Sequence, residues 1–239
     1  MVNAIFEKWA TGFSGCDGGH IGDSKNPSIW FCGIEGGGGH PDDEQELHKI
    51  FLKDVSAPAE GEPNWEENIE VRFNWQAMKL LSAINGGSVS DYKLFAENIR
   101  PFVKGEQGYY KMNLYPLAFR NTEHQLWKNA FAKATSFEIK QKYIDWITSC
   151  RFPLMKSWVQ AYEPKLIVCT GITYASNFRM AFVDDGLEFN REIIDDRELH
   201  WVVNKNGTTV VVIPFMSRNG LTRDISIQKF GEKIRALLM

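Results

Sequence analysis

Short, almost purely apolar runs alternate along this chain with longer stretches in which apolar residues recur at helical spacing. Because nearly every residue of the short runs is apolar, they predict strands that are covered on both faces of a sheet. Strands that alternate with helices are typical of an α/β protein. We therefore predict a three-layer α/β/α sandwich with a central, mostly parallel sheet of about four strands; the predicted strand segments are 29–32, 109–114, 166–169, 201–204 and 210–214.

Helical periodicity is clearest where apolar residues repeat every three or four positions, as in NWEENIEVRFNWQAMKLLSAIN. The dipeptide Asn206-Gly207 predicts a tight hairpin turn between the last two strands. We expect a single domain over residues 1–239, with an irregular segment at 1–28 and a helical insertion at 41–100 between the first and second core strands. The main predicted helices are 41–55, 64–85, 91–99, 172–182 and one that ends at Met239.

The composition of the chain limits the classes of protein to which it can belong. With 239 residues and 44% hydrophobic content, the chain can bury a sizeable core. No apolar run approaches the roughly 20 residues of a membrane span, and MVNAIFEKWA lacks the features of an export signal, so we expect a cytoplasmic protein without a membrane partner. The cysteines are scattered and the histidines lack metal-ligand spacing, so we expect no metal and no cofactor.

Charge is distributed unevenly along the chain, although the net formal charge is only −3. Residues 1–100 hold 8 basic and 16 acidic side chains, a formal charge of −8, whereas residues 101–239 hold 19 and 14, a formal charge of +5. The overall balance argues against a protein that coats nucleic acid by bulk attraction. A local basic face in the second part remains compatible with nucleic-acid binding.

The stretch IWFCGIEGGGGH places one carboxylate, Glu35, and four consecutive glycines at the end of a predicted strand. Open α/β sheets bind ligands at the carboxyl ends of their strands. The loop lacks the Gly-Lys-Ser/Thr ending of a P-loop and does not fit G-x-G-x-x-G, and the chain has no G-x-S-x-G elbow. Two interpretations stay open: a tight surface turn, or a site in which an acid positions water and backbone amides stabilise negative charge.

Several segments, in order and spanning residues 29–235, resemble the uracil-DNA glycosylase superfamily, especially its branch with small iron-sulfur members. WFCGIEGGG looks like the first family motif, and VRFNWQAMKLL resembles the segment that carries the base-stacking aromatic residue. YYKMNLYPLAFRN is similar to the strand whose Asn reads the base edge. PKLIVCTGITYASNF and VVVIPFMSRNGL look like the late strand-helix unit and the DNA-inserting loop.

The resemblance implies a uracil-DNA glycosylase-like fold and a role for particular residues. Glu35 falls where relatives position the attacking water, and Asn113 falls at the base-reading amide, which both donates and accepts hydrogen bonds. The partner implied is DNA, with single strands included. The implied substrate-binding residues are Gly33, Ile34, Gly36, Gly37, Phe73 and Phe215, and the implied nucleic-acid contacts are Arg120, Ser217, Arg218 and Asn219.

Three departures separate this chain from the family pattern. Phe215 stands where the family presents a His to the departing base, a loss on the order of 3 kcal/mol if it matches removal of an oxyanion-hole donor. Gly36 replaces the proline of the first motif. Cys150 falls where the family has one cluster cysteine, but Tyr115 stands where its neighbour in the cluster would be, and the chain has no N-terminal C-x-x-C. We therefore predict no iron-sulfur cluster.

Three functional hypotheses follow. The first is a DNA glycosylase-like hydrolase that acts on uracil or another modified base, with Glu35 and Asn113 as catalytic residues. The second is a catalytically inactive module that binds a nucleobase, a nucleic acid or a partner in the same crevice. The third is a hydrolase for free nucleosides or nucleotides.

Overall fold

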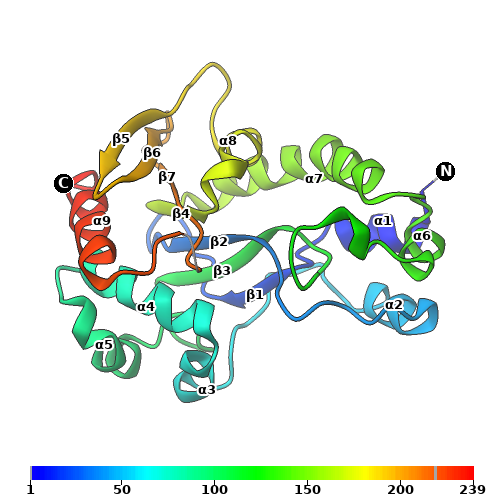
Figure 1. The fold of residues 1–239 in the computed structure, drawn as a ribbon, viewed down its shortest axis with the longest axis horizontal. Helices are drawn as coiled ribbons and strands as arrows, with labels where there is room; N and C mark the ends of the chain where they lie inside the picture. The colour runs from blue at the N-terminus through cyan, green and yellow to red at the C-terminus, as the bar shows by residue number, and fades with distance from the viewer. Residues whose placement is uncertain (1, 218–219) are drawn as a thin grey trace.

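The computed structural model describes residues 2–217 and 220–239, and in these residues one mixed sheet runs through the molecule (Figure 1). The sheet has seven strands in the order β1-β3-β2-β4-β7-β6-β5. Its strands are β1 (Cys16–Gly19), β2 (Ile29–Glu35), β3 (Tyr109–Tyr115), β4 (Leu166–Thr170), β5 (Asn190–Ile194), β6 (Arg197–Val203) and β7 (Thr209–Ile213).

The centre of the sheet is parallel and its margins are antiparallel. Strand β2 pairs in parallel with both β3 and β4, and β4 pairs in parallel with β7. Strand β1 is antiparallel to β3, and β5 and β6 continue the sheet beyond β7 in antiparallel pairs. The predicted α/β class is confirmed, but the prediction of a mostly parallel sheet of about four strands is wrong: antiparallel strands extend the parallel centre on both sides and make the sheet mixed.

Helices cover both faces of the sheet. One face is covered by α1 (Ala4–Ala10), α2 (Glu44–Phe51), α6 (Asn129–Thr135), α7 (Lys140–Tyr162) and α8 (Ala175–Phe182). The other face is covered by α4 (Arg72–Ile84), α5 (Tyr92–Ile99) and α9 (Asp224–Ala236). Short helices lie at α3 (Trp65–Glu70), η1 (Val89–Asp91), η2 (His124–Leu126) and η3 (Ile172–Tyr174).

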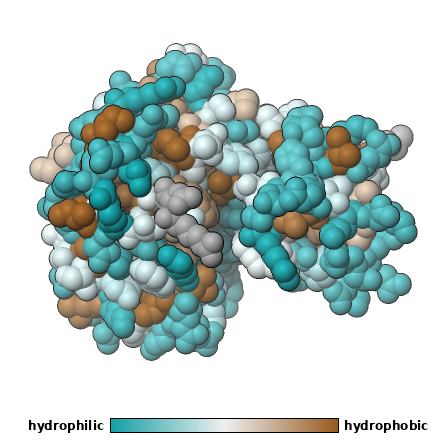
Figure 2. All heavy atoms as spheres, viewed as in Figure 1, coloured by the Kyte–Doolittle hydropathy of each residue, from teal (hydrophilic) through white to brown (hydrophobic). Residues whose placement is uncertain are grey.

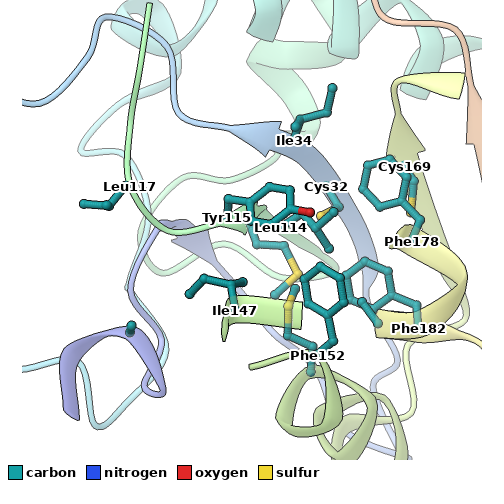
Figure 3. Packing of buried hydrophobic residues seen from close by; sticks show 14 of the residues in the cluster. Cys32, Ile34, Leu114, Tyr115, Leu117, Ile147, Phe152, Cys169, Phe178 and Phe182 are labelled. Carbon is teal, nitrogen blue, oxygen red and sulfur yellow. The ribbon is translucent and has the colours of Figure 1, made fainter. Parts of the chain in front are cut away.

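The parallel strands send alternate side chains into two apolar layers, as a sheet buried on both faces requires. Cys32, Leu114 and Cys169 face the layer of α7 and α8, where they meet Phe152, Phe178 and Phe182 (Figure 3). The neighbouring positions Phe31 and Val168 face α4 and α9. The central strands are therefore fixed from both sides, and their carboxyl ends form a rigid base for a site.

Two segments differ from the sequence-based expectation. Residues 1–28 are not irregular throughout, because they contain α1 and the edge strand β1. Residues 64–85 form two helices rather than one, because Val71 adopts an extended conformation (φ −77°, ψ 122°) between α3 and α4. The break gives α4 its own start, so that Phe73 and Asn74 lie in its first turn.

Among the described residues, no helix combines the length and apolar character that crossing a membrane requires.

Candidate functional site

A large cleft of about 1610 Å³ lies beyond the carboxyl ends of the four parallel strands. Its lining includes the residues that follow each of these strands: Gly36 after β2, Pro116 after β3, Gly171 after β4 and Pro214 after β7. The surface is hollowed between the part of the molecule that holds α4 and α9 and the part that holds α1, α2 and α6 (Figure 2). Ligands of open α/β sheets bind at this end of the strands.

Asn113 is a polar side chain in a strand whose seven residues are all buried. Both its backbone N–H and its side-chain Nδ2 donate to the carbonyl oxygen of Gly15, at 3.0 and 3.1 Å. This pair of bonds fixes the orientation of the amide. The Oδ1 atom and the second N–H of Nδ2 have no partner among the described residues, which leaves one acceptor and one donor at the cleft.

Gly33 is the cross-strand partner of Asn113 in the β2–β3 register. A Cβ at position 33 would lie 2.5 Å from Asn113 Oδ1 and 3.9 Å from the tip of the Phe73 ring. Only glycine leaves room for the amide at this point. The sequence-predicted residues Gly33, Phe73 and Asn113 are thus brought together at one place.

Phe73 and Phe215 form an aromatic wall of the cleft. Their ring centroids are 6.1 Å apart at an interplanar angle of 32°, and Phe73 also contacts Phe31 edge-on at 5.8 Å. Phe73 is half-buried, and Phe215 is 40% exposed. A planar ligand that stacks on these rings would lie beside the Asn113 amide.

The glycine loop is clamped to residues 118–119, which follow β3. Phe119 N–H donates to Gly36 O at 3.0 Å, His40 N–H donates to Ala118 O at 2.8 Å, and Ala118 N–H donates to His40 Nδ1 at 2.8 Å. Because Nδ1 accepts a hydrogen bond, the ring is neutral in this arrangement. Burial lowers the pKa of His40, and the positive charge of Lys53 lowers it further.

Glu35 does not present its carboxylate to the cleft in the way the sequence suggests. The side chain is only 5% exposed, and both oxygens accept hydrogen bonds from Lys140 Nζ at 3.0 and 3.1 Å. Lys140 is itself 2% exposed and lies 3.9 Å above the Phe119 ring. Burial raises the pKa of Glu35 and lowers that of Lys140, although the mutual attraction of the pair opposes both shifts.

Lys111 is a cleft residue that the sequence analysis missed. Its ammonium donates to Asn74 Oδ1 at 2.9 Å and lies 3.3 Å from the carboxylate of Asp17. Asn74 donates onward to Asn68 Oδ1 at 2.8 Å. All of these residues except Asn68 line the cleft. The signal was present in the sequence, since a lysine within the apolar strand YYKMNLY is unusual in a buried sheet.

The remaining predicted site residues have different settings. Ile34, Gly37, Arg120 and Ser217 all line the cleft. Ile34 also packs in the apolar layer of α7 and α8, and Gly37 borders open space. Arg218 and Asn219 lie outside the described residues. The rim formed by residues 54–62 is acidic, with Asp54, Glu60 and Glu62 in the lining. Among the described residues, the lysine and arginine side chains that line the cleft are Lys53, Lys111 and Arg120.

Sequence comparisons add no relatives: no protein-family model matches the chain, and a search of curated proteins finds no similar sequence. In the described part of the chain, no group of three or more His, Cys, Asp or Glu side chains could hold a metal ion. The functional argument therefore depends on the geometry of the cleft.

Proposed function

We propose that this protein recognises a base of DNA in the cleft and hydrolyses its N-glycosidic bond, as a divergent protein of uracil-DNA glycosylase type. The observation that carries the proposal is the meeting of Gly33, Phe73 and Asn113 at the carboxyl ends of β2 and β3. An oriented amide and an aromatic ring are the two groups that reading a flipped base requires. Uracil presents an N3–H donor beside a carbonyl acceptor on its pairing edge, and this pair is complementary to the free acceptor and donor of Asn113.

The charged groups near the cleft give further support to the proposal. Cleavage of the bond leaves positive character on the sugar and negative charge on the departing base. Glu35 supplies an anion at the end of β2, and Lys140 keeps that anion in a buried ion pair. In the hydrolytic reading, Glu35 holds the attacking water with one oxygen while the other stays with Lys140.

A second candidate function is recognition of a base without cleavage. It is favoured by the same ion pair, because both Glu35 oxygens are occupied by Lys140. It is favoured also by Phe215, which offers no hydrogen bond to a departing base. A binding protein needs Asn113 and Phe73 but neither a free carboxylate nor a His.

Single- and double-stranded oligonucleotides that carry uracil, hypoxanthine or hydroxymethyluracil distinguish the two candidates. For the glycosylase, we expect abasic product from the wild type and a loss of at least a hundred-fold in rate for Glu35→Gln, with binding retained. Binding by both proteins without product would support the second candidate. Absence of both binding and product in folded protein would refute the proposed function.

The variant Phe215→His distinguishes the two candidate functions independently of Glu35. Phe215 is exposed enough to accept the change without loss of core packing, and it lies next to Phe73. If the chain is a weak glycosylase, the new donor should raise the cleavage rate. If the protein only binds, the variant should show no cleavage while it still binds the oligonucleotide.

A further inference from the structure

Lys111 lies inside β3, whose seven residues are all buried. No other fully buried strand of the described sheet carries a charged side chain. The exposed fraction of Lys111 is 6%, and the charged end reaches the cleft lining. Placing an ammonium in such a position is costly unless its donors are used.

An ammonium has three N–H donors. One of them is donated to Asn74 Oδ1 at 2.9 Å. The Asp17 carboxylate lies 3.3 Å from the ammonium as an ion pair. No other hydrogen-bond acceptor or acidic partner of Lys111 occurs among residues 2–217 and 220–239. These two contacts hold the ammonium in place and leave at least one donor for a ligand.

The position of Lys111 connects it to the base-reading residues. It precedes Asn113 by two positions in β3, so both side chains leave the same face of the sheet. Its partner Asn74 follows Phe73 in the first turn of α4. Lys111 is thus hydrogen-bonded to the residue next to Phe73 and lies two positions from Asn113 on the same face of β3, and all four residues line the cleft.

We propose that Lys111 is a specificity-determining residue that donates a hydrogen bond to a ring carbonyl oxygen of the base. The inference rests on the proposed function and names its substrate class: bases with carbonyl oxygens, such as uracil, in preference to bases with an amino group at that place, such as cytosine. The ammonium is a donor only, so it pairs with a carbonyl and is opposed by an amino group. It also supplies positive charge near a departing base, which Phe215 does not.

The test compares wild type with Lys111→Met in binding to single-stranded oligonucleotides that carry uracil, cytosine, 2-thiouracil, 4-thiouracil or an abasic site. The matched control is Lys79→Met, because Lys79 is also mostly buried and ion-paired, to Asp224, but does not line the cleft. Loss of one charge-assisted hydrogen bond should lower the uracil preference by roughly ten-fold or more in Lys111→Met only. Wild type should bind one of the two thiouracil oligonucleotides more weakly than it binds the uracil oligonucleotide. Lys111→Met should bind these two oligonucleotides with equal affinity.

The outcomes separate this inference from the proposed function. If Lys111→Met keeps the wild-type ratio of uracil to cytosine affinity, the role of Lys111 is refuted while base recognition stands. If the variant does not fold, the thiouracil series on wild type decides, since equal affinity for uracil and both thiouracils would refute the contact. A wild type that binds uracil and abasic oligonucleotides equally would refute the proposed function itself.

Discussion

Gly33 leaves the space that the Asn113 side chain fills, and this makes the position sensitive to any larger residue. For Gly33→Ala, the new Cβ would lie 2.5 Å from Asn113 Oδ1, so the amide must move away from its bond to Gly15. We expect a drop of about 1–3 kcal/mol in the free energy of unfolding, as for other overpacked sites, together with loss of base binding. Urea unfolding and oligonucleotide binding measure the two effects.

Gly37 offers a matched control for that substitution. A Cβ at position 37 meets nothing within 4 Å, and the residue is not among the glycines with positive φ. Gly37→Ala should not change the free energy of unfolding measurably, because the added Cβ displaces no neighbour. Equal effects of the two substitutions would contradict the account of Gly33.

A second prediction at the residue scale concerns the buried ion pair between Glu35 and Lys140. Lys140→Met removes the partner of a carboxylate that is 5% exposed, and breaking a buried pair typically costs about 3–5 kcal/mol. Lys142→Met is the control, because Lys142 lies on the same helix and makes an exposed pair with Glu138. Urea unfolding of Lys140→Met and Lys142→Met checks this prediction, which requires the larger loss of unfolding free energy in Lys140→Met.

The double variant Glu35→Leu with Lys140→Met separates a buried charge from lost packing. Because it leaves no unpaired charge, it should recover most of the stability that Lys140→Met loses. A double variant as unstable as the single one would show that the pair matters through its shape alone.

At the scale of elements, the clamp between the glycine loop and residues 118–119 is sensitive to pH. The folded state holds His40 neutral and lowers its pKa below the usual 6.5. The stabilisation is therefore complete above about pH 6.5 and is lost as the pH falls through the lowered pKa of the folded protein. We expect the urea midpoint of wild type to fall between pH 7.5 and pH 5 more steeply than that of His40→Asn.

Exposed His48 gives the comparison for this measurement, because it lies on the surface of α2. His48→Asn should keep the pH dependence of wild type. If His40→Asn and wild type lose stability in parallel, the clamp does not depend on neutral His40.

The sequence pattern predicts some elements better than others for a physical reason. The central strands are apolar on nearly every residue because helices cover both of their faces, and this pattern is easy to recognise. Strands β1 and β5 lie at the two edges of the sheet, and their sequences CDGG and NREII are polar or partly exposed. Neither resembles a buried strand, so both were missed and the number of strands was underestimated.

At the scale of the whole molecule, Arg151 of α7 anchors the segment that supports Asn113. The guanidinium is fully buried and donates to the carbonyl oxygens of Ala10, Gly12 and Ser14 and to the Ser14 hydroxyl. Gly15, the next residue, accepts the hydrogen bonds of Asn113. One arginine thereby links the long helix α7 to the orientation of the amide.

Replacement of this anchor should therefore affect both stability and the site. Arg151→Met leaves several buried carbonyls unsatisfied, and we expect a loss of about 3 kcal/mol or more in the free energy of unfolding. Amide hydrogen exchange should rise in residues 10–16. Arg179→Met is the control, since Arg179 makes a more exposed pair with Glu188, and its exchange pattern in 10–16 should match wild type.

The candidate site was predictable in part. The coincidence of a strand end, an acid and glycines pointed to the end of the sheet where the cleft lies, and Gly33, Phe73 and Asn113 meet there. The partners that determine what each residue does were not predictable, because they come from far along the chain: Lys140 is 105 positions from Glu35, and Gly15 is 98 from Asn113. Such contacts depend on how the layers pack, which local pattern does not encode.

The most direct test of base recognition by Asn113 compares wild type, Asn113→Asp and Asn129→Asp in binding to oligonucleotides with a single uracil or a single abasic site. Asn129 lies exposed at the start of α6, outside the cleft lining, and controls for the added charge. We predict that wild type and Asn129→Asp prefer uracil, and that Asn113→Asp loses this preference by roughly ten-fold or more because a carboxylate lacks the donor. An unchanged preference in Asn113→Asp would contradict the account.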